Sequence, residues 1–440
     1  MKTRCLLAAA ALLLFGVALL RTPPIRPAER MAELHETRQP ALPAVVPPSP
    51  PVMAPPAIAA PEPSTLLAGL AKALREGDTD EARRLLVLLR AAILPKMPPA
   101  ERNAALLYQK AFDLFAAAPY VAAEQAAFDK ASSGGALTPE EREALRSFMA
   151  NRKDAFKLLH DAAQLPDCVF PVAYDDGFAA LLPHIGPSIR ASKLLRCEAM
   201  LFRFDGDEPA AAAATMAGLA LSRGVRNDTL LVSQLVAIVV DGIGSADAMR
   251  SLDDEMAETM AWARGVNPSI PRDAMARSLY GEVVIAVDLY LKGQREPLGD
   301  DASRVLDNPL KLQDAAFYVE TMQKMIELSA RPYAESRMEL DAIEANPMPW
   351  YAEGSKLVLP AISRAARNAA VTESMLVKAR LAAALKDYRA RTGTYPVALE
   401  ILGTPPRDPL TGLPVLYRQD GAGFVLETPE NENATWRATK

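Results

Sequence analysis

The sequence predicts a mainly helical protein that ends in a small segment of mixed helix and strand. Three observations point to this fold class. Apolar residues recur at helical spacing from residue 64 to about residue 368, and a strand pattern first appears at residue 415. A stretch dense in proline separates the helical region from an apolar N-terminal run. We therefore expect an irregular, multi-helix all-α body at residues 64–370, followed at 371–440 by a tail made of a helix and a β-hairpin.

The N-terminal end has the pattern of an export signal. Lys2 and Arg4 precede an apolar run from Cys5 to Leu20. The run ends in leucine, where a signal peptidase needs a small side chain, so we expect residues 1–21 to stay as an uncleaved signal anchor. With such an anchor we expect the bulk of the chain to lie outside the cytoplasm, held at the membrane by residues 1–21. A cleaved signal peptide on a secreted protein is the alternative.

A proline-rich stretch follows the apolar run. Residues 22–63 hold thirteen of the 37 prolines, mixed with alanine and valine. Such a composition does not build a core and favours extended polyproline II, at about 3 Å per residue. We expect a disordered stalk that holds the body away from the membrane.

The all-α body begins with two helices joined by a tight turn. Ser64 and Thr65 can cap the first helix, and the stretch Leu74–Arg83 turns it into the second. The stretch 204–210 has a similar pattern, but no fixed period connects the two, so the body is not a regular solenoid. Further helices are expected near 138–161, 187–204, 208–223, 229–251, 271–292, 309–330 and 355–369.

The tail opens with a helix. Its apolar positions are spaced three and four residues apart over 371–391. Gly393 can close the helix in the left-handed conformation, and Pro396 prevents the helix from resuming. The segment 397–402 is long enough for only a short helical turn.

A turn and two strands complete the tail. The carboxylate of Asp408 can accept backbone N–H groups, and Pro409 fixes the backbone angle that a turn needs. Gly412 releases the chain from the turn. The runs 415–418 and 424–427 flank a glycine-bearing loop and predict a β-hairpin.

This tail resembles the soluble part of the major pseudopilin of bacterial type II secretion, and also the tail of large, uncharacterised exported bacterial proteins. The resemblance covers about the last 70 residues. It implies a place in the bacterial cell envelope, with the bulk of the chain in the periplasm at the inner membrane, near a secretion or pilus-like apparatus. Pseudopilins often bind calcium in a last acidic loop, but the end of this chain lacks the aspartates and glycines of such a loop. The residues that carry the motif are Tyr388, Gly393, Tyr395, Pro396, Leu399, Asp408, Pro409, Thr411, Gly412 and Tyr417.

The tail is expected to be a fixed cap rather than a separate module. One helix and a two-stranded hairpin do not form a stable unit alone in water. We therefore expect the helix to pack against the hairpin on one side and against the all-α body on the other, with Leu381 and Leu385 buried.

Histidine and cysteine offer little chemistry. His35 lies in the proline-rich stretch, and Cys168 and Cys197 are the only cysteines beyond the apolar run. In an exported protein two thiols either form a disulfide or lie buried, and both outcomes stay open here. A zinc site that adds His160 and His184 is a third alternative, but the spacing matches no usual ligand pattern. The sequence predicts neither a metal nor a cofactor.

Carboxylates on apolar helices are the remaining candidates for chemistry. Asn227, Gln234 and Asp241 recur every seven residues, so they share one narrow face of a mostly apolar helix. The simpler interpretation is a polar stripe bonded to a neighbour such as Arg223 or Arg226, because buried polar groups need partners in any fold. The sequence thus assigns no catalytic residue.

Composition limits the classes of function. The net charge of −5 gives no attraction to nucleic acid. The leading hypothesis is a scaffold or partner-binding protein of the cell envelope, attached to the membrane by its N-terminal helix. The alternative is an envelope hydrolase whose active site is assembled from dispersed carboxylates. The apolar loop that contains Trp350 either docks on a partner or fills a seam between helices.

Overall fold

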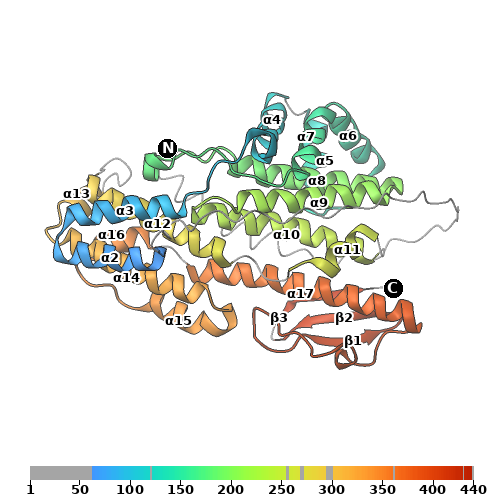
Figure 1. The fold of residues 1–440 in the computed structure, drawn as a ribbon. Helices are drawn as coiled ribbons and strands as arrows, with labels where there is room; N and C mark the ends of the chain where they lie inside the picture. Colours follow the sequence, from blue (N-terminus) through green and yellow to red (C-terminus); the bar gives the residue numbers. More distant parts are fainter. Residues whose placement is uncertain are drawn as a thin grey trace, which may run out of the picture.

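The computed structural model describes residues 62–118, 121–253, 257–267, 272–293, 301–359, 362–429 and 431–438. The predicted signal segment 1–21 and the proline-rich stretch up to residue 61 lie outside these residues, so the anchor and the stalk stay predictions. The described chain is mainly helical and ends in a small antiparallel sheet (Figure 1). This confirms the fold class that the sequence predicts.

The elements follow one another along the chain as a long series of helices and then three strands. The α-helices are α2 (Pro63–Glu76), α3 (Thr79–Ile93), α4 (Ala104–Ala117), α5 (Ala122–Ser132), α6 (Pro139–Ala150), α7 (Lys153–Ala163), α8 (Ile185–Asp205), α9 (Glu208–Val225), α10 (Leu231–Asp253), α11 (Ala257–Gly265), α12 (Arg272–Lys292), α13 (Ala302–Leu306), α14 (Lys311–Ser329), α15 (Tyr333–Ala345), α16 (Glu353–Val358) and α17 (Ile362–Thr392). The 3-10 helices are η1 (Ala100–Arg102), η2 (Tyr174–Ala179) and η4 (Leu399–Leu402), and the strands are β1 (Leu416–Asp420), β2 (Gly423–Thr428) and β3 (Asn431–Ala438).

The two tight turns have the chemistry that the sequence predicts. α2 ends at Gly77, which has a φ of 76°, and the side chain of Asp78 then accepts the N–H of Glu81 to cap α3. Gly206 and Asp207 repeat the arrangement between α8 and α9. The left-handed glycine ends the first helix, because its N–H bonds to a free carbonyl of the last turn. The aspartate then starts the second helix, because its side chain accepts a free N–H of the first turn.

The buried apolar residues form three clusters. The first lies between α2, α3, α12 and α14, and its members include Leu67, Leu70, Leu279, Val319 and Met322. The second lies between α4, α7, α8 and α9, and its members include Tyr108, Phe148, Leu159, Leu194 and Leu221. The third lies between α11, α17 and the sheet, and its members include Met260, Ala263, Leu385, Phe424 and Leu426.

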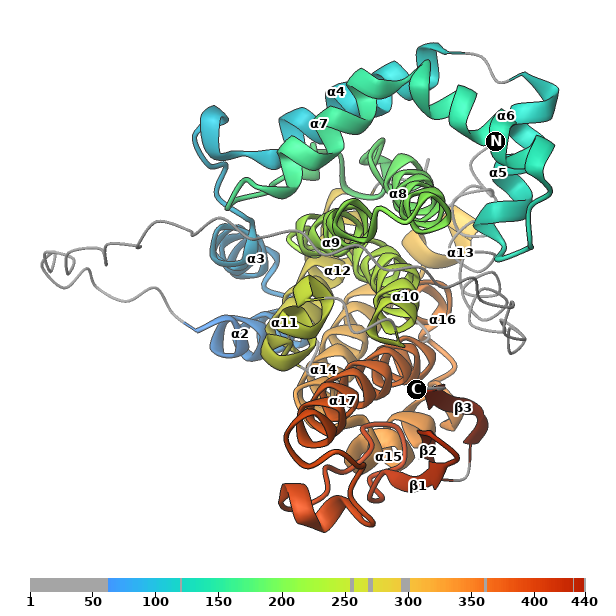
Figure 2. The same cartoon turned by 90° about the vertical axis from the view of Figure 1, so that its right-hand side faces the viewer.

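Helix α10 contributes to all three clusters and lies between α9 and α17 in both views (Figure 2). Its contributions are Leu231 and Ile238 to the first, Val236, Ala237 and Val240 to the second, and Met249 and Leu252 to the third. In the described part of the chain, its segment Leu231–Met249 is the one stretch long and apolar enough to cross a bilayer, and 72% of it is buried inside the fold. Such a helix is the core around which the others pack.

Helix α17 joins the all-α body to the tail without a break. It begins at Ile362, in the first apolar cluster, and continues into the third, where it covers the sheet. It also packs against α10, α11 and α15. The expected boundary at residues 370/371 therefore falls inside one helix of 31 residues. The expected packing of the tail helix on the sheet and on the body is confirmed. Leu385 is buried as expected, whereas Leu381 is only partly buried.

Several boundaries differ from the sequence prediction. The helix expected near 138–161 is two helices, α6 and α7, because the chain breaks at Asn151 and Arg152. Helices α5, α11 and α15 were not predicted, since their short apolar patterns are weak. The hairpin is extended to a three-stranded sheet of order β1-β2-β3. The strand β3 was not predicted because its many polar residues do not alternate clearly with apolar ones.

Candidate functional site

The polar stripe of α10 pairs with α9 rather than opening to solvent. Asp241 is half-buried and accepts hydrogen bonds from Ser222 and from the guanidinium of Arg226. Gln234 donates to the backbone carbonyl groups of Arg226 and Asp228, at 2.8 and 3.0 Å. The prediction of a bonded, structural Asp241 is confirmed.

Two details of this stripe differ from the expectation. Asn227 lies in the turn before α10, not on the helix, and donates to the backbone carbonyl of Cys168 at 2.8 Å. Burial raises the pKa of Asp241 above its usual range, while the neighbouring Arg226 opposes the shift. A raised pKa suits a general acid, but neither of the two described recesses is lined by Asp241. The carboxylate therefore braces two helices.

A second carboxylate of α10 has an equally closed environment. Asp247 is 2% exposed and accepts two hydrogen bonds from the guanidinium of Arg203 on α8, at 2.8 and 3.0 Å. Thr215 on α9 donates to the same carboxylate. The sequence analysis missed this group, although Asp247 lies six residues after Asp241 on the same helix. The bidentate pair joins α8, α9 and α10 at one point.

His184 and Ser233 both bond to one aspartate in the second apolar cluster. The imidazole Nε2 lies 2.7 Å from Asp228 Oδ2, and the Ser233 hydroxyl donates to the same oxygen at 2.9 Å. Phe170 stacks on His184 with ring centroids 4.2 Å apart. A serine nucleophile has to bond to the imidazole that activates it, whereas here the serine and the histidine share the carboxylate. With His184 1% exposed, this group is structural.

The cysteines follow the second of the two alternatives that the sequence left open. Cys168 and Cys197 are free and buried in the second apolar cluster. Burial raises the pKa of each thiol to about 12, so neither is a thiolate at neutral pH. His160 bonds to Glu198 at 2.8 Å, and the described residues contain no cluster of three or more potential metal ligands. The zinc alternative thus finds no ligand cluster in the described part of the chain.

Two further carboxylates, the half-buried Glu282 and the buried Asp314, accept backbone N–H groups at the starts of other helices. Glu282 on α12 accepts the N–H of Leu231 at the start of α10, at 2.9 Å. A Cβ on the adjacent Gly281 would lie 1.7 Å from the carbonyl oxygen of Thr229, so only glycine permits this approach. Asp314 accepts the N–H groups of Gly354 and Ser355 at the start of α16. These acids satisfy backbone donors and are not paired with each other.

The carboxylate of Asp408 accepts four hydrogen bonds within the tail. Its Oδ1 accepts the N–H groups of Leu410 and Thr411, at 2.9 and 3.3 Å. Its Oδ2 accepts the hydroxyl of Ser374 on α17 at 2.5 Å and that of Thr428 on β2 at 2.9 Å. One carboxylate, 0% exposed, therefore links the turn, the helix and the sheet.

A buried lysine completes this group. Lys378 is 2% exposed, and its ammonium donates to Thr428 at 2.5 Å and to Ser374 at 3.2 Å. Burial lowers the pKa of Lys378 to about 8, against the opposing charge of Asp408. A serine and a low-pKa lysine four residues apart can form a catalytic dyad, but this pair is enclosed and bonded within the tail. We call Ser374, Lys378, Asp408 and Thr428 the tail lock.

The other motif residues of the tail also hold it together. Gly393 has a φ of 83°, and Gly412 has a φ of 74° and lies against Ala334 of α15. Tyr417 donates to the carbonyl oxygen of Pro396 at 2.7 Å, and Tyr395 packs edge-on against Phe424. The remaining members of the motif lie in the same unit: Tyr388 on α17, Leu399 in the third apolar cluster, and Pro409 and Thr411 in the turn.

The sheet has an exposed edge with apolar neighbours. β1 pairs only with β2 in the sheet order, so its other side is an edge. Leu416 on this strand is 50% exposed and Val397 is 82% exposed. The bond from Tyr417 to Pro396 brings these two segments together. Ile401 and Leu413 are exposed in the same unit. We call these four exposed apolar side chains of the tail, Val397, Ile401, Leu413 and Leu416, the tail patch.

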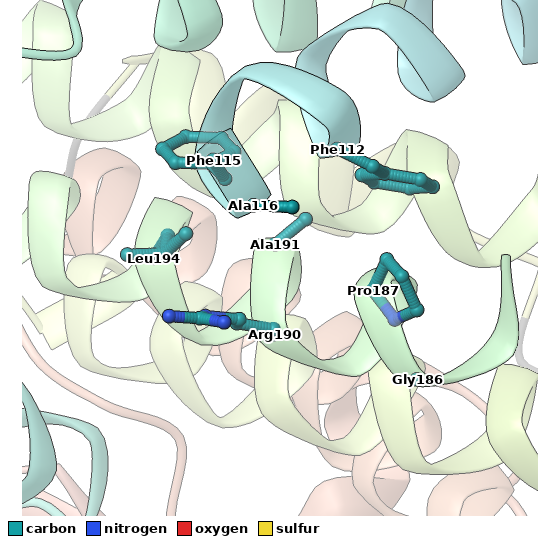
Figure 3. A pocket seen from close by; sticks show the side chains of 8 residues that line it. All are labelled: Phe112, Phe115, Ala116, Gly186, Pro187, Arg190, Ala191 and Leu194. Carbon is teal, nitrogen blue, oxygen red and sulfur yellow. The ribbon is translucent and has the colours of Figure 1, made fainter. Parts of the chain in front are cut away.

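A recess of the described chain lies between α4 and α8 (Figure 3). It has a volume of about 290 Å³ and lies outside every group described above. Its lining residues are Phe112, Phe115 and Ala116 of α4 and Gly186, Pro187, Arg190, Ala191 and Leu194 of α8. We call it the α4–α8 recess.

Trp350 does not fill a seam between helices. It is 77% exposed and packs edge-on against Tyr351. The docking alternative for this loop thus stays a prediction.

No family model matches the chain, and no curated protein or solved structure matches it. The likeness of the tail to pseudopilins therefore rests on its sequence motif alone.

Proposed function

We propose that this protein is a non-catalytic scaffold of the bacterial cell envelope that binds a protein partner through the edge of its C-terminal sheet. The observation that carries the proposal is the tail patch beside the exposed edge of β1. Exposed strand edges with apolar side chains are templates for a partner strand, since the free N–H and C=O groups supply hydrogen bonds and the side chains supply specificity.

The rigidity of the tail supports the same proposal. The tail lock and helix α17 fix the sheet to the all-α body, so a partner that binds β1 meets a preformed surface. A preformed surface costs little conformational entropy on binding. The envelope location and the nearness to a secretion or pilus-like apparatus come from the N-terminal pattern and the tail motif of the sequence.

The carboxylates of the body fit a scaffold better than a hydrolase. Asp228, Asp241 and Asp247 each bond to a cation or an imidazole inside the fold. A hydrolase built on carboxylates needs two of them facing one open pocket. Acids committed to internal partners instead make the body stiff, as a platform for binding requires.

Site-specific photo-crosslinking in membranes tests this proposal. A benzophenone amino acid replaces Val397 in the full-length chain, and a matched chain carries it at Val87, which is 67% exposed on α3. The expected result is one discrete protein adduct at position 397 that is absent at position 87. Adducts of equal amount and pattern at the two positions, or no adduct at 397, would rule out the tail patch as a partner face.

A further inference from the structure

The α4–α8 recess combines an apolar floor with a single cation. Phe112 and Phe115 form the floor and are 5% and 4% exposed, while Leu194 of the lining is fully buried. Figure 3 shows the two phenylalanines of α4 facing the α8 side chains, while Arg190 extends along α8. Among the described lining residues, Arg190 is the only charged one.

The chemistry of this lining selects a ligand with two parts. An apolar floor gains about 25 cal/mol for each Å² of hydrocarbon that leaves water. A guanidinium forms bidentate hydrogen bonds with a carboxylate, and its five N–H donors allow it to do so beside contacts within the protein. No acid among the described lining residues would repel an anion.

The start of α8 adds to the preference for an anion. Gly186 and Pro187 lie in the first turn of this 21-residue helix and line the recess. The N-terminal end of a helix carries a partial positive charge, which favours a negative group nearby. Arg190 and the helix end therefore act in the same direction.

We propose that the α4–α8 recess binds a monocarboxylate with a short hydrocarbon tail, the tail lying on Phe112 and Phe115 and the carboxylate on Arg190. This ligand site is independent of the proposed partner face, since the recess lies in the second apolar cluster and the tail patch lies beside the third. A volume of about 290 Å³ is at the lower end of ligand pockets and suits a single short chain.

Gly186 offers a way to close the recess without disturbing the fold. A Cβ at this position would meet no atom within 4 Å, so a larger side chain would project into open space. Gly265 on α11 is similar, with nothing within 4 Å of a Cβ, but it lies outside the recess. Gly186→Leu and Gly265→Leu therefore form a matched pair of variants.

Equilibrium dialysis of radiolabelled decanoate against the full-length chain tests the site, at concentrations below micelle formation. The expected result is one bound decanoate per chain. Arg190→Gln should weaken binding about tenfold or more, Arg190→Lys by less, and decanol should bind about tenfold more weakly than decanoate, since a charge-assisted hydrogen bond contributes at least this factor. Gly186→Leu should abolish binding and Gly265→Leu should leave it unchanged.

Three results would overturn the proposal. They are undiminished binding to Gly186→Leu, equal binding of decanoate and decanol, and unchanged binding to Arg190→Gln. Circular dichroism shows whether each variant is folded. If the arginine variants do not fold, Gly186→Leu still tests the site, since it adds a side chain where space is open.

Discussion

Two aspartates, the buried Asp408 and the half-buried Asp241, show how differently the tail and the helical body use the same side chain. Asp408 accepts two N–H groups from its own turn and two hydroxyl groups from α17 and β2. Asp241 depends on Arg226 and Ser222, both on another helix. The first group is organised by a local turn, and the second depends on how α9 and α10 pack. Bonds between neighbouring residues can be recognised as a motif in the sequence, whereas partners brought together by helix packing cannot.

The largest expected effect is at Asp408. Asp408→Ala should lower the free energy of unfolding by about 3–5 kcal/mol, because it removes the turn bonds and the acceptor of the Ser374 and Thr428 hydroxyls, and because it takes away a negative charge that favours the charged form of Lys378. Asp408→Asn keeps an oxygen for the turn and should cost less. Urea denaturation of both variants measures the difference. A loss below about 1 kcal/mol for the alanine variant would mean that the tail lock is not what holds the tail.

Leucine 385 tests whether the tail shares its core with the body. Leu385→Ala should cost about 2–5 kcal/mol, because Leu385 of α17 is 0% exposed within the third apolar cluster. Leu381 is only partly buried, so Leu381→Ala should cost clearly less. Denaturation should remain a single transition by far-ultraviolet and near-ultraviolet circular dichroism. Separate transitions of tail and body would contradict the fixed cap.

The tail lock also predicts a dependence on pH. The pKa of Lys378 is lowered to about 8 in the folded chain, against a pKa of about 10.4 in the unfolded chain. Between pH 8 and pH 10.4, roughly, the unfolded state therefore binds more protons than the folded state. Stability should therefore rise with pH across this window, by up to about 3 kcal/mol. The pH profile of stability is compared with that of Lys378→Met, in which this rise should be absent. Parallel pH profiles of the two chains would show that Lys378 does not titrate in the window.

The ion pair of Arg226 and Asp241 should tolerate replacement by apolar side chains, unlike the tail lock. Arg226→Met alone should cost about 2 kcal/mol, because it leaves the half-buried Asp241 without its cation, although protonation of Asp241 limits the loss. Adding Asp241→Leu should restore most of the stability, since an apolar pair of similar size fills the same space. A double variant less stable than the single one would show that this brace cannot be replaced by packing.

The smallest expected effect is at His160. Its bond to Glu198 raises the pKa of the imidazole, so the stabilisation is complete below about pH 6.5 and is lost as pH rises through the folded pKa. Because the side chain is 31% exposed, the change should stay below about 1 kcal/mol. His160→Gln should flatten this part of the stability profile. A profile identical to that of the unaltered chain would mean that the pair makes no net contribution.

The sequence by itself determined the parts of the fold that depend on neighbouring residues. Gly77 and Asp78, or Asp408 and Gly412, produce their turns through side chains and backbone angles only a few residues apart. The helical period of the long helices and the stop at Gly393 are local in the same sense. Because these interactions form within one turn of chain, they can be predicted from residue order without knowing the rest of the molecule.

Tertiary structure alone decided where the polar side chains find their partners and where a recess remains. Asp247 meets Arg203 across 44 residues, Lys378 meets Thr428 across 50, and Phe115 faces Leu194 from another helix. No local signal marks such pairs, because any exposed arginine or threonine has the same appearance in sequence. The physical reason is that burial strongly favours bonded polar groups, but only the packing of helices around α10 determines which partner is in reach.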